Sequence, residues 1–425
     1  MSKSIRVAAV DLNGQLRGKR VPKAMRGKQM RMPLSVLNID VFGADIQDSP
    51  LVFDSGDQDG VMEPAGRDPV PLPWVAGEAE LDLRVMHNED GSPFEGDPRI
   101  ALSEVLNRYA HHGWQVIAAC ELEFFLLAEG DTLAPPLNPK TGRRLSGTEI
   151  LSLRELDGFD HFFNDVAECA KLMGIGDLTI TTEAGVGQFE VTMTHGPALH
   201  IADNVILLKE LIKGTARNHG MAATFMAKPF SDESGNGLHT HFSVINQAGE
   251  NIFCSQDKLQ SAVAGCLEAF EASTLFFAPY VNSFDRFVEG AHAPTSATWG
   301  YENRTVAMRI PSGPDAATRI EHRVAGGDAN PYLLFAAIFG AALGGIERNS
   351  VPPAPIEGNA YEHPTELPGL LPDLSAAIDG LDAPLLEHFM PALILENLAA
   401  TKSQERDLFD KLSDHEALMA LIDTA

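Results

Sequence analysis

Four short segments of the chain alternate ionisable and apolar residues with the period of a β-strand. They read CELEF (120–124), GVGQFEVTM (185–193), LHTHFSV (238–244) and RIEHR (319–323). Since successive side chains of a strand point to opposite faces of a sheet, each segment predicts a strand with one polar face and one mostly apolar face. The polar faces hold Glu, His and Arg with almost no Lys, so solvent exposure explains them poorly as a set.

These polar faces admit two explanations. For any single strand, the simpler one is the solvent side of a surface strand. Together they favour a shared site in which crowded carboxylates would repel one another unless cations neutralise them. Carboxylates with a histidine suit Mg²⁺ or Mn²⁺, so the pattern predicts more than one divalent ion. The glutamates concerned are Glu121, Glu123, Glu183, Glu190 and Glu321.

The arginines of these segments extend the hypothesis. A guanidinium stays charged and offers paired donors to phosphate or carboxylate oxygens, and metals beside arginines favour phosphoryl transfer. The chain has no GxxxxGK[ST] loop, and SGNGLH (234–239) is a turn too generic to bind phosphate alone. We therefore expect metals and arginines to hold any ATP.

Composition excludes several other classes. A net charge of −27 over 425 residues repels a nucleic-acid backbone, so no nucleic-acid partner is expected. The apolar run 333–346 is too short to span a membrane; it predicts a buried helix capped by Asn330 with Pro331 at its first position. The start of the chain lacks the pattern of a signal peptide. The four cysteines show no CxxC spacing, which predicts free thiols in the cytoplasm.

The order of the segments predicts an α+β fold in two parts. Residues 1–97 contain short apolar pieces and turns that suit a small sheet domain, and residues 98–425 form a larger catalytic domain. Pro98 opens a helix with Asp97 as its cap. Further helices are expected at 160–174, 197–220 and about 257–278, with strands at 114–127, 222–230, 304–310 and 318–325.

Several long motifs together resemble the glutamine synthetase family. They are CELEFFLL, EAGVGQFEV, FMAKPFSDESGNGLHTHFS, NSFDRFVEGAHAP, NRTVAMRIP and RIEHRVAGGDANPYLLFAAI, in the family's order across roughly residues 98–345. The resemblance implies a β-grasp-like N-terminal domain and a catalytic domain with a curved antiparallel sheet. It also implies a homo-oligomeric ring, expected as a dodecamer, with active sites between subunits.

The resemblance implies the following site residues. Two or three Mg²⁺ or Mn²⁺ ions would be held by Glu123, Glu183 and Glu190 and by Glu121, His239 and Glu321. Arg286 and Arg323 would bind the carboxylates of L-glutamate, with Gly235 contributing backbone and Ser234 beside it. Arg304 and Arg309 would steady the transferring phosphoryl group, Arg319 the nucleotide, and His241 with Ser243 the ATP. The implied reaction phosphorylates the γ-carboxylate of glutamate, and an amine then displaces the phosphate.

Several positions depart from members of the family that use ammonia. His292 stands where those members carry a glutamate that helps to bind ammonium, and an imidazole binds ammonium more weakly. Ser234 replaces an asparagine, and Thr181 replaces a histidine. Asp59 is a candidate for the aspartate that a neighbouring subunit lends to the ammonium site. These changes resemble the branch that includes γ-glutamylputrescine and γ-glutamylmethylamide synthetases, and predict an organic amine or polyamine as acceptor.

Two alternatives remain open at this stage. One is a true glutamine synthetase that uses ammonia. The other is a ring-forming scaffold or sensor without catalysis, which loss of metal ligands would reveal; all six expected ligands are present. Tyr361 lies where some bacterial members carry an adenylylated tyrosine, but its flanking residues differ, which favours a structural role.

Overall fold

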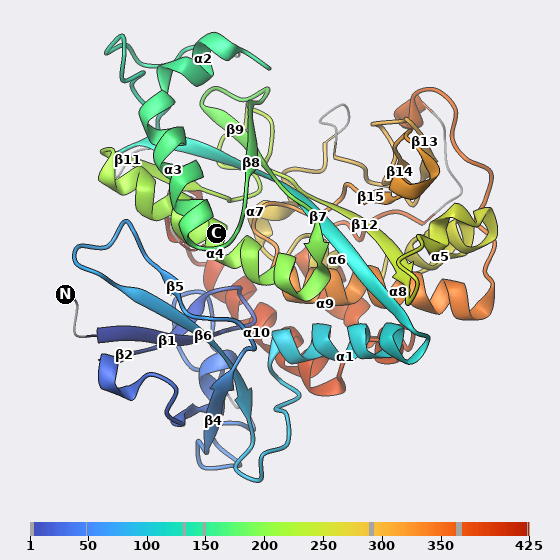
Figure 1. The fold of residues 1–425 in the computed structure, drawn as a ribbon, viewed down its shortest axis with the longest axis horizontal. Helices are drawn as coiled ribbons and strands as arrows, with labels where there is room; N and C mark the ends of the chain where they lie inside the picture. Colours follow the sequence, from blue (N-terminus) through green and yellow to red (C-terminus); the bar gives the residue numbers. More distant parts are fainter. Residues whose placement is uncertain are drawn as a thin grey trace.

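The computed structural model describes residues 4–47, 49–130, 133–147, 150–288, 293–362, 368–422 and 424. The chain has an α+β fold with two sheets, as predicted (Figure 1). The smaller sheet has six strands in the order β2-β1-β6-β4-β3, with β5 paired to β6. Its strands are β1 (Ser4–Val10), β2 (Leu16–Pro22), β3 (Met30–Pro33), β4 (Asp59–Pro64), β5 (Val70–Pro71) and β6 (Glu80–His87). All six lie before residue 98; the division into two domains there stays a prediction.

The larger sheet has nine strands in the order β13-β14-β15-β12-β7-β9-β8, with β10 and β11 also paired to β7. The long strand β7 (Trp114–Ala128) crosses the molecule in Figure 1 and joins most of this sheet. Its partners are antiparallel; β13 and β14 run parallel. The other strands are β8 (Leu178–Thr182), β9 (Gln188–Met193), β10 (Gly196–Pro197), β11 (Met221–Thr224), β12 (Leu238–Asn246), β13 (Trp299–Tyr301), β14 (Met308–Ile310) and β15 (Ile320–His322).

Helices flank this sheet. They are α1 (Pro98–His111), α2 (Leu153–Gly158), α3 (Asp160–Leu172), α4 (Ala198–Asn218), α5 (Gln256–Glu268), α6 (Thr274–Phe277), α7 (Val281–Phe284), α8 (Pro331–Arg348), α9 (Leu374–Asp379), α10 (Ala392–Phe409) and α11 (Asp414–Ile422). Both predicted caps are confirmed. Asp97 accepts hydrogen bonds from the first-turn amides of α1, and Asn330 does so for α8. No helix in the described ranges is both long and apolar enough to cross a membrane.

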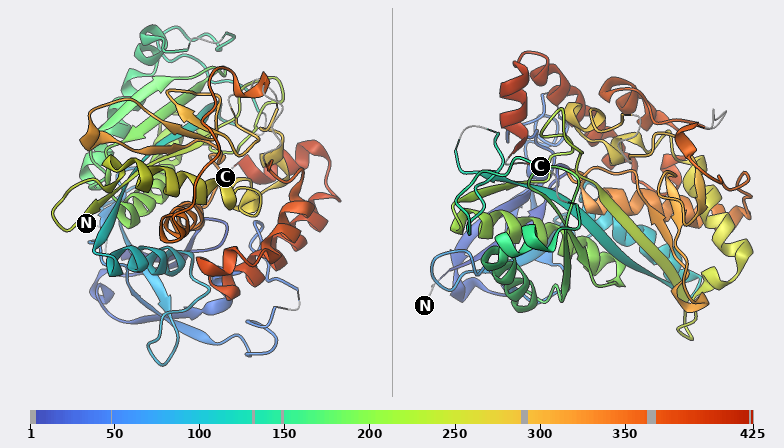
Figure 2. Two further views of the ribbon diagram at one scale, coloured as in Figure 1. Left: turned by 90° about the vertical axis from the view of Figure 1, so that its right-hand side faces the viewer. Right: turned by 90° about the horizontal axis from the view of Figure 1, so that it is seen from above.

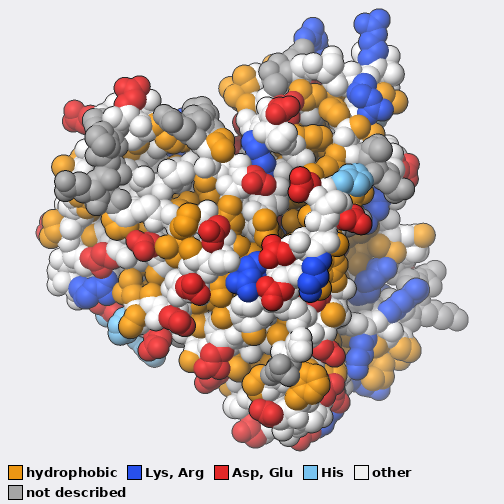
Figure 3. Space-filling model, turned by 180° about the vertical axis from the view of Figure 1, so that it is seen from behind, with side chains coloured by type: hydrophobic (Ala, Val, Ile, Leu, Met, Phe, Trp, Pro, Cys, Tyr) orange, Lys and Arg blue, Asp and Glu red, His pale blue; other side chains and the backbone are white. Residues whose placement is uncertain are grey.

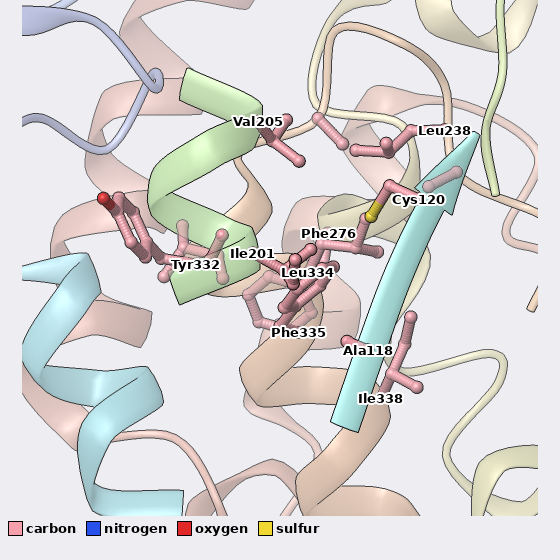
Figure 4. Packing of buried hydrophobic residues seen from close by; sticks show 14 of the residues in the cluster. Ala118, Cys120, Ile201, Val205, Leu238, Phe276, Tyr332, Leu334, Phe335 and Ile338 are labelled. Atoms are coloured by element: carbon pink, nitrogen blue, oxygen red, sulfur yellow. The ribbon is translucent and has the colours of Figure 1, made fainter. Parts of the chain in front are cut away.

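The core lies between the large sheet and helices α4 and α8. Figure 4 shows Ala118 and Cys120 of β7 beside Ile201 and Val205 of α4 and Phe335 and Ile338 of α8. Helix α8 is apolar around most of its surface and almost entirely buried. Helix α5 approaches it closely at two glycines: a Cβ on Gly265 would lie 2.1 Å from the Ala341 carbonyl, and one on Gly345 would lie 2.1 Å from that of Ser261. A larger residue at either position would force these helices apart.

Four predicted elements are shorter than expected, and one of them, the strand predicted over 318–325, is paired only over Ile320–His322. The helix predicted over 257–278 ends at Glu268, and the separate short helix α6 follows. The strand predicted over 304–310 is paired only from Met308. The strand predicted over 222–230 ends at Thr224, because the backbone of Met226 bonds to side chains and not to a neighbouring strand. The Thr224 hydroxyl accepts from the Met226 amide, and Asn236 donates to the Met226 carbonyl at 2.9 Å.

The ends of the chain meet in a buried polar contact. Lys402 of α10 is fully buried and donates to Glu405 at 2.7 Å and to Asn13, after β1, at 2.6 Å. Glu405 also accepts from Asn13 at 2.7 Å and from the Val41 amide at 2.8 Å. The Lys402 ammonium lies 3.9 Å from the centre of the Tyr280 ring. Figure 2 shows the C-terminal helices beside the N-terminal segment in both views.

Removing the charge of Lys402 should leave Glu405 as an unpaired buried anion. We expect Lys402→Met to lower the free energy of unfolding by about 3–5 kcal/mol, measured by urea denaturation. The double variant Lys402→Met/Glu405→Gln should recover part of this loss, because the amide oxygen of glutamine keeps the bonds from Asn13 and Val41 without the charge. A double variant no more stable than the single variant would contradict this account.

Candidate active site

The four segments with polar faces become neighbouring strands of the large sheet. β15, β12, β7 and β9 follow one another in that order. In the register of these strands His239 lies opposite Glu121, His241 opposite Glu321, and Glu123 opposite Glu190. Directly opposed residues share a face of the sheet, so the structure brings the polar residues together on one face.

The first candidate metal centre contains Glu121, His239 and Glu321. One ligand atom from each lies within 4.8 Å of the others. His239 Nδ1 lies 3.0 Å from Glu121 Oε2, and Glu321 is fully buried. Two carboxylates and an imidazole on adjacent strands form a donor set that fits a divalent ion such as Mg²⁺ or Mn²⁺. These are the three ligands that the resemblance implied for one ion.

A second centre adjoins the first and shares a residue with it. Glu123, Glu190 and His239 also offer ligand atoms within 4.8 Å of one another. Glu123 accepts from the Gly237 amide at 2.5 Å, which orients its carboxylate. Glu183, implied as a third ligand here, follows β8, and its own amide donates to the Gln188 carbonyl at 2.9 Å. It stands outside this close group, and its role stays a prediction.

The electrostatics of the face fit bound cations. Burial raises the pKa of Glu190 to about 8, with the charges of Glu121 and Glu123 adding to the effect. Burial and the same two neighbours raise the pKa of Glu183 to about 7. Burial alone would also raise the pKa of Glu121, but hydrogen bonds with His239 and His241 lower it below its usual value. Such crowding is relieved when a divalent cation occupies the face.

Two arginines border the first centre. Arg309 Nη1 donates to Glu321 Oε2 at 2.6 Å, and Arg323 Nη1 donates to the other oxygen of the same carboxylate. The Nε atoms of both arginines are buried and have no hydrogen-bond partner among the described residues. Arg309 also makes long contacts of 3.4 and 3.5 Å to Glu302. The Nε–H group of each guanidinium is therefore available to donate a hydrogen bond to an anion.

The loop 234–237 packs against Arg286. This arginine is buried, and its Nη1 donates to the Val324 carbonyl at 2.6 Å. A Cβ on Gly235 would lie 2.7 Å from Arg286 Cγ and 2.5 Å from the Ala227 carbonyl, so only glycine fits there without displacement. Ser234 is half-buried beside it.

Two residues that support this loop were not predicted. Gln188 lies two residues before Glu190 in β9, so both belong to the same face of the strand; it is buried and donates at 3.0 Å to both the Gly235 carbonyl and Asn236 Oδ1. Asn236 is itself fully buried and bonds to the carbonyl groups that end β11. In the sequence, the only signal for support of this loop is an amide side chain within a Gly-rich segment.

A cavity of about 420 Å³ opens at the other end of the same face. Its lining includes His241, Ser243 and Arg319, the residues implied for ATP. Arg319 Nε lies 3.4 Å from His241 Nδ1. Thr194 and His195, directly after β9, also line this cavity and were not predicted.

Besides Glu183, three predicted residues are not part of these clusters. Asp59 begins β4 of the small sheet and is exposed. Arg304 is exposed, although its charge acts to lower the pKa of Glu183. His292 lies outside the described residues. A larger cavity, of about 1220 Å³, is lined by residues such as Phe230, Asp285 and Leu418, and none of the predicted metal ligands lines it. On the face shown in Figure 3, acidic side chains are spread between hydrophobic and uncharged areas.

Comparison with known proteins bears on the family and the fold of the chain. A family model described as the glutamine synthetase catalytic domain matches residues 95–419. The chain is 37% identical over 377 residues to the γ-glutamylputrescine synthetase PuuA of Escherichia coli K12, covering 84% of this chain and 78% of that protein. It is 32% identical over 365 residues to the glutamine synthetase of Pyrococcus abyssi, covering 85% and 79%.

A solved structure of GmaS in complex with ADP superposes on the chain with a TM-score of 0.83. The two sequences are 29% identical, and the match covers 97% of this chain and 95% of that one. The similarity therefore extends through both sheets, beyond the residues matched by the family model.

Mn²⁺ should stabilise the protein through these two centres. A ligand at 100 times its Kd adds about 2.7 kcal/mol to the free energy of unfolding, so titration calorimetry should detect binding and the melting temperature should rise. We expect Glu123→Gln to weaken Mn²⁺ binding at least tenfold, because it removes an anionic ligand. Glu271→Gln, which changes an exposed glutamate, is the matched control. Equal Mn²⁺ affinity in the two variants would refute the assignment.

Proposed function

The chain belongs to the glutamine synthetase family, and from this premise we propose that it joins the γ-carboxylate of L-glutamate to an organic amine, using ATP. The observation that carries the proposal is the face of the large sheet, where two carboxylate–histidine clusters adjoin arginines with unpaired donors. That combination suits transfer of a phosphoryl group to a carboxylate.

The reaction has two chemical steps. An oxygen of the γ-carboxylate attacks the γ-phosphorus of ATP, and the bond from that phosphorus to the bridging oxygen of ADP breaks. The nitrogen of a neutral amine then attacks the carbonyl carbon of γ-glutamyl phosphate, inorganic phosphate leaves, and the nitrogen loses a proton. Two or three Mg²⁺ or Mn²⁺ ions, when bound, would neutralise charge on the phosphate oxygens.

The residues of the chain have distinct tasks in this proposal. Arg286 and Arg323 hold the carboxylates of glutamate, supported by the unpaired Nε of Arg323 and the charge of Arg286. Arg309 and Arg304 stabilise the charge that develops during phosphoryl transfer. The nucleotide occupies the cavity lined by His241, Ser243 and Arg319.

An organic acceptor is favoured over ammonia by two findings. The chain shares 37% identity with a γ-glutamylputrescine synthetase and 32% with a glutamine synthetase. The resemblance also implies that His292 stands where ammonia-using members carry a glutamate. A non-catalytic scaffold is disfavoured because all six expected ligands are retained.

The proposal also covers the oligomeric state of the protein and its location in the cell. We infer a homo-oligomeric ring, a dodecamer, in which Asp59 of one subunit reaches the site of its neighbour. Its place in the small sheet, apart from the clusters of its own chain, supports this. All four cysteines are free thiols, which supports a reducing compartment such as the cytoplasm.

Arg304→Ala should lower kcat by roughly 100-fold or more while leaving stability unchanged. The reason is that an exposed arginine contributes little to folding, whereas a donor aimed at developing charge is worth about 2.7–4 kcal/mol in the transition state. Steady-state kinetics and urea denaturation measure the two effects. Arg348→Ala, which removes a surface pair with Glu268, should change neither. Parallel loss of turnover and stability in Arg304→Ala would end this assignment.

Phosphate release with glutamate, ATP and Mg²⁺ or Mn²⁺ tests the acceptor directly. Ammonia is compared with methylamine, ethanolamine, putrescine and larger amines. We expect an organic amine to exceed ammonia by more than tenfold in kcat/KM, about 1.4 kcal/mol of transition-state preference. His292→Glu should raise the use of ammonia. Preference of the unmodified protein for ammonia would make it a glutamine synthetase instead.

A further inference from the structure

Tyr361 is fixed beside the loop that carries Arg304. It lies in the short helix η5 (Ala360–Glu362). Thr305 Oγ1 accepts from the Ala360 amide at 2.9 Å and donates to Asn303 Oδ1 at 2.6 Å. Asn303 in turn donates to the Gly358 carbonyl at 2.8 Å. These bonds hold the backbone of Tyr361 in a defined place beside Asn303 and Thr305, the two neighbours of Arg304.

The hydroxyl of Tyr361 has no structural partner. The side chain is half-buried, but its Oη is shielded from solvent and makes no hydrogen bond with any described residue. Buried hydroxyls are normally paired. A tyrosine kept only for packing would place this oxygen in solvent or against a carbonyl, as Tyr109 does with the Phe339 carbonyl at 2.8 Å.

Tyr361 lines a cavity of about 270 Å³ together with Phe287, the residue directly after Arg286, and the arginine charges that act on its hydroxyl are cationic. Burial raises the pKa of Tyr361, and the nearby charges of Arg323 and Arg286 act in the opposite direction. Arg323 also has a buried Nε without a partner. An N–H and an O–H that both lack an acceptor in one region are satisfied together by the oxygens of an anion.

We propose that Tyr361 Oη donates a hydrogen bond to a carboxylate oxygen of the acid substrate held by Arg286 and Arg323. Tyr361 is then a substrate-binding residue, in addition to the arginines. This inference rests on the proposed function, because the anion is taken to be glutamate. The phenol hydroxyl is a neutral hydrogen-bond donor with a fixed direction, beside the two cationic guanidiniums. It therefore favours a planar carboxylate bound in one orientation.

Tyr361→Phe removes only the oxygen and keeps the ring. We expect the KM for glutamate, and its Kd from titration calorimetry with Mg²⁺ but without ATP, to rise roughly tenfold, the value of a hydrogen bond to a charged group. The KM for ATP should stay within about twofold. Tyr109→Phe is the matched control, because it removes a buried hydroxyl outside the site and should change thermal stability rather than glutamate affinity.

The outcomes separate this inference from the proposed function. If the unmodified protein ligates glutamate and Tyr361→Phe leaves both its KM and Kd unchanged, the inference is wrong and the proposed function stands. If the protein binds glutamate without ligating it, the proposed function fails, and the calorimetric comparison still decides the role of Tyr361. An equal rise in the KM for ATP would indicate general disturbance of the site and would also overturn the inference.

Discussion

The antiparallel register between β7 and β12 is the constraint on which the site depends. It joins nine residue pairs, from Leu238 opposite Leu122 to Asn246 opposite Trp114. Because strand side chains alternate, a slip of one residue would turn every side chain of one strand to the other face. Either the carboxylates of β7 or the histidines of β12 would then enter the core, and apolar residues of that strand would line the site. The pairing of β7 with β12 therefore determines both which residues face the core and which face the site.

This arrangement explains why so much apolar surface lies behind the sheet. Glu121 and Glu123 alternate along β7 with Cys120, Leu122 and Phe124, which are fully buried. The mutual repulsion of the carboxylates opposes folding in the absence of cations, and burial against α4 and α8 offsets it. Catalytic groups are often held in positions that lower the stability of the folded protein.

The sequence predicted the local features well because their causes are local. Alternation in β7 and β12 and the caps Asp97 and Asn330 depend on residues close in the chain. The motifs also indicated the family, which the comparisons confirm, and implied a set of metal ligands. The order of the strands could not be derived from pattern alone, since His239 and Glu121 are 118 residues apart. The amides that support the loop at Gly235 were missed for the same reason: Gln188 and Asn236 find their partners only in the folded chain.

The buried contact of Lys402 has a consequence for biosynthesis. Its partner Asn13 lies 389 residues earlier, so the small sheet is synthesised long before α10 exists. At roughly 5–20 residues per second, the ribosome needs about 20–80 seconds to complete that interval. During this time the polar groups of Asn13 and Val41 stay exposed to water on a nascent chain. The contact between these two segments can therefore form only late, after the strands of both sheets have been synthesised.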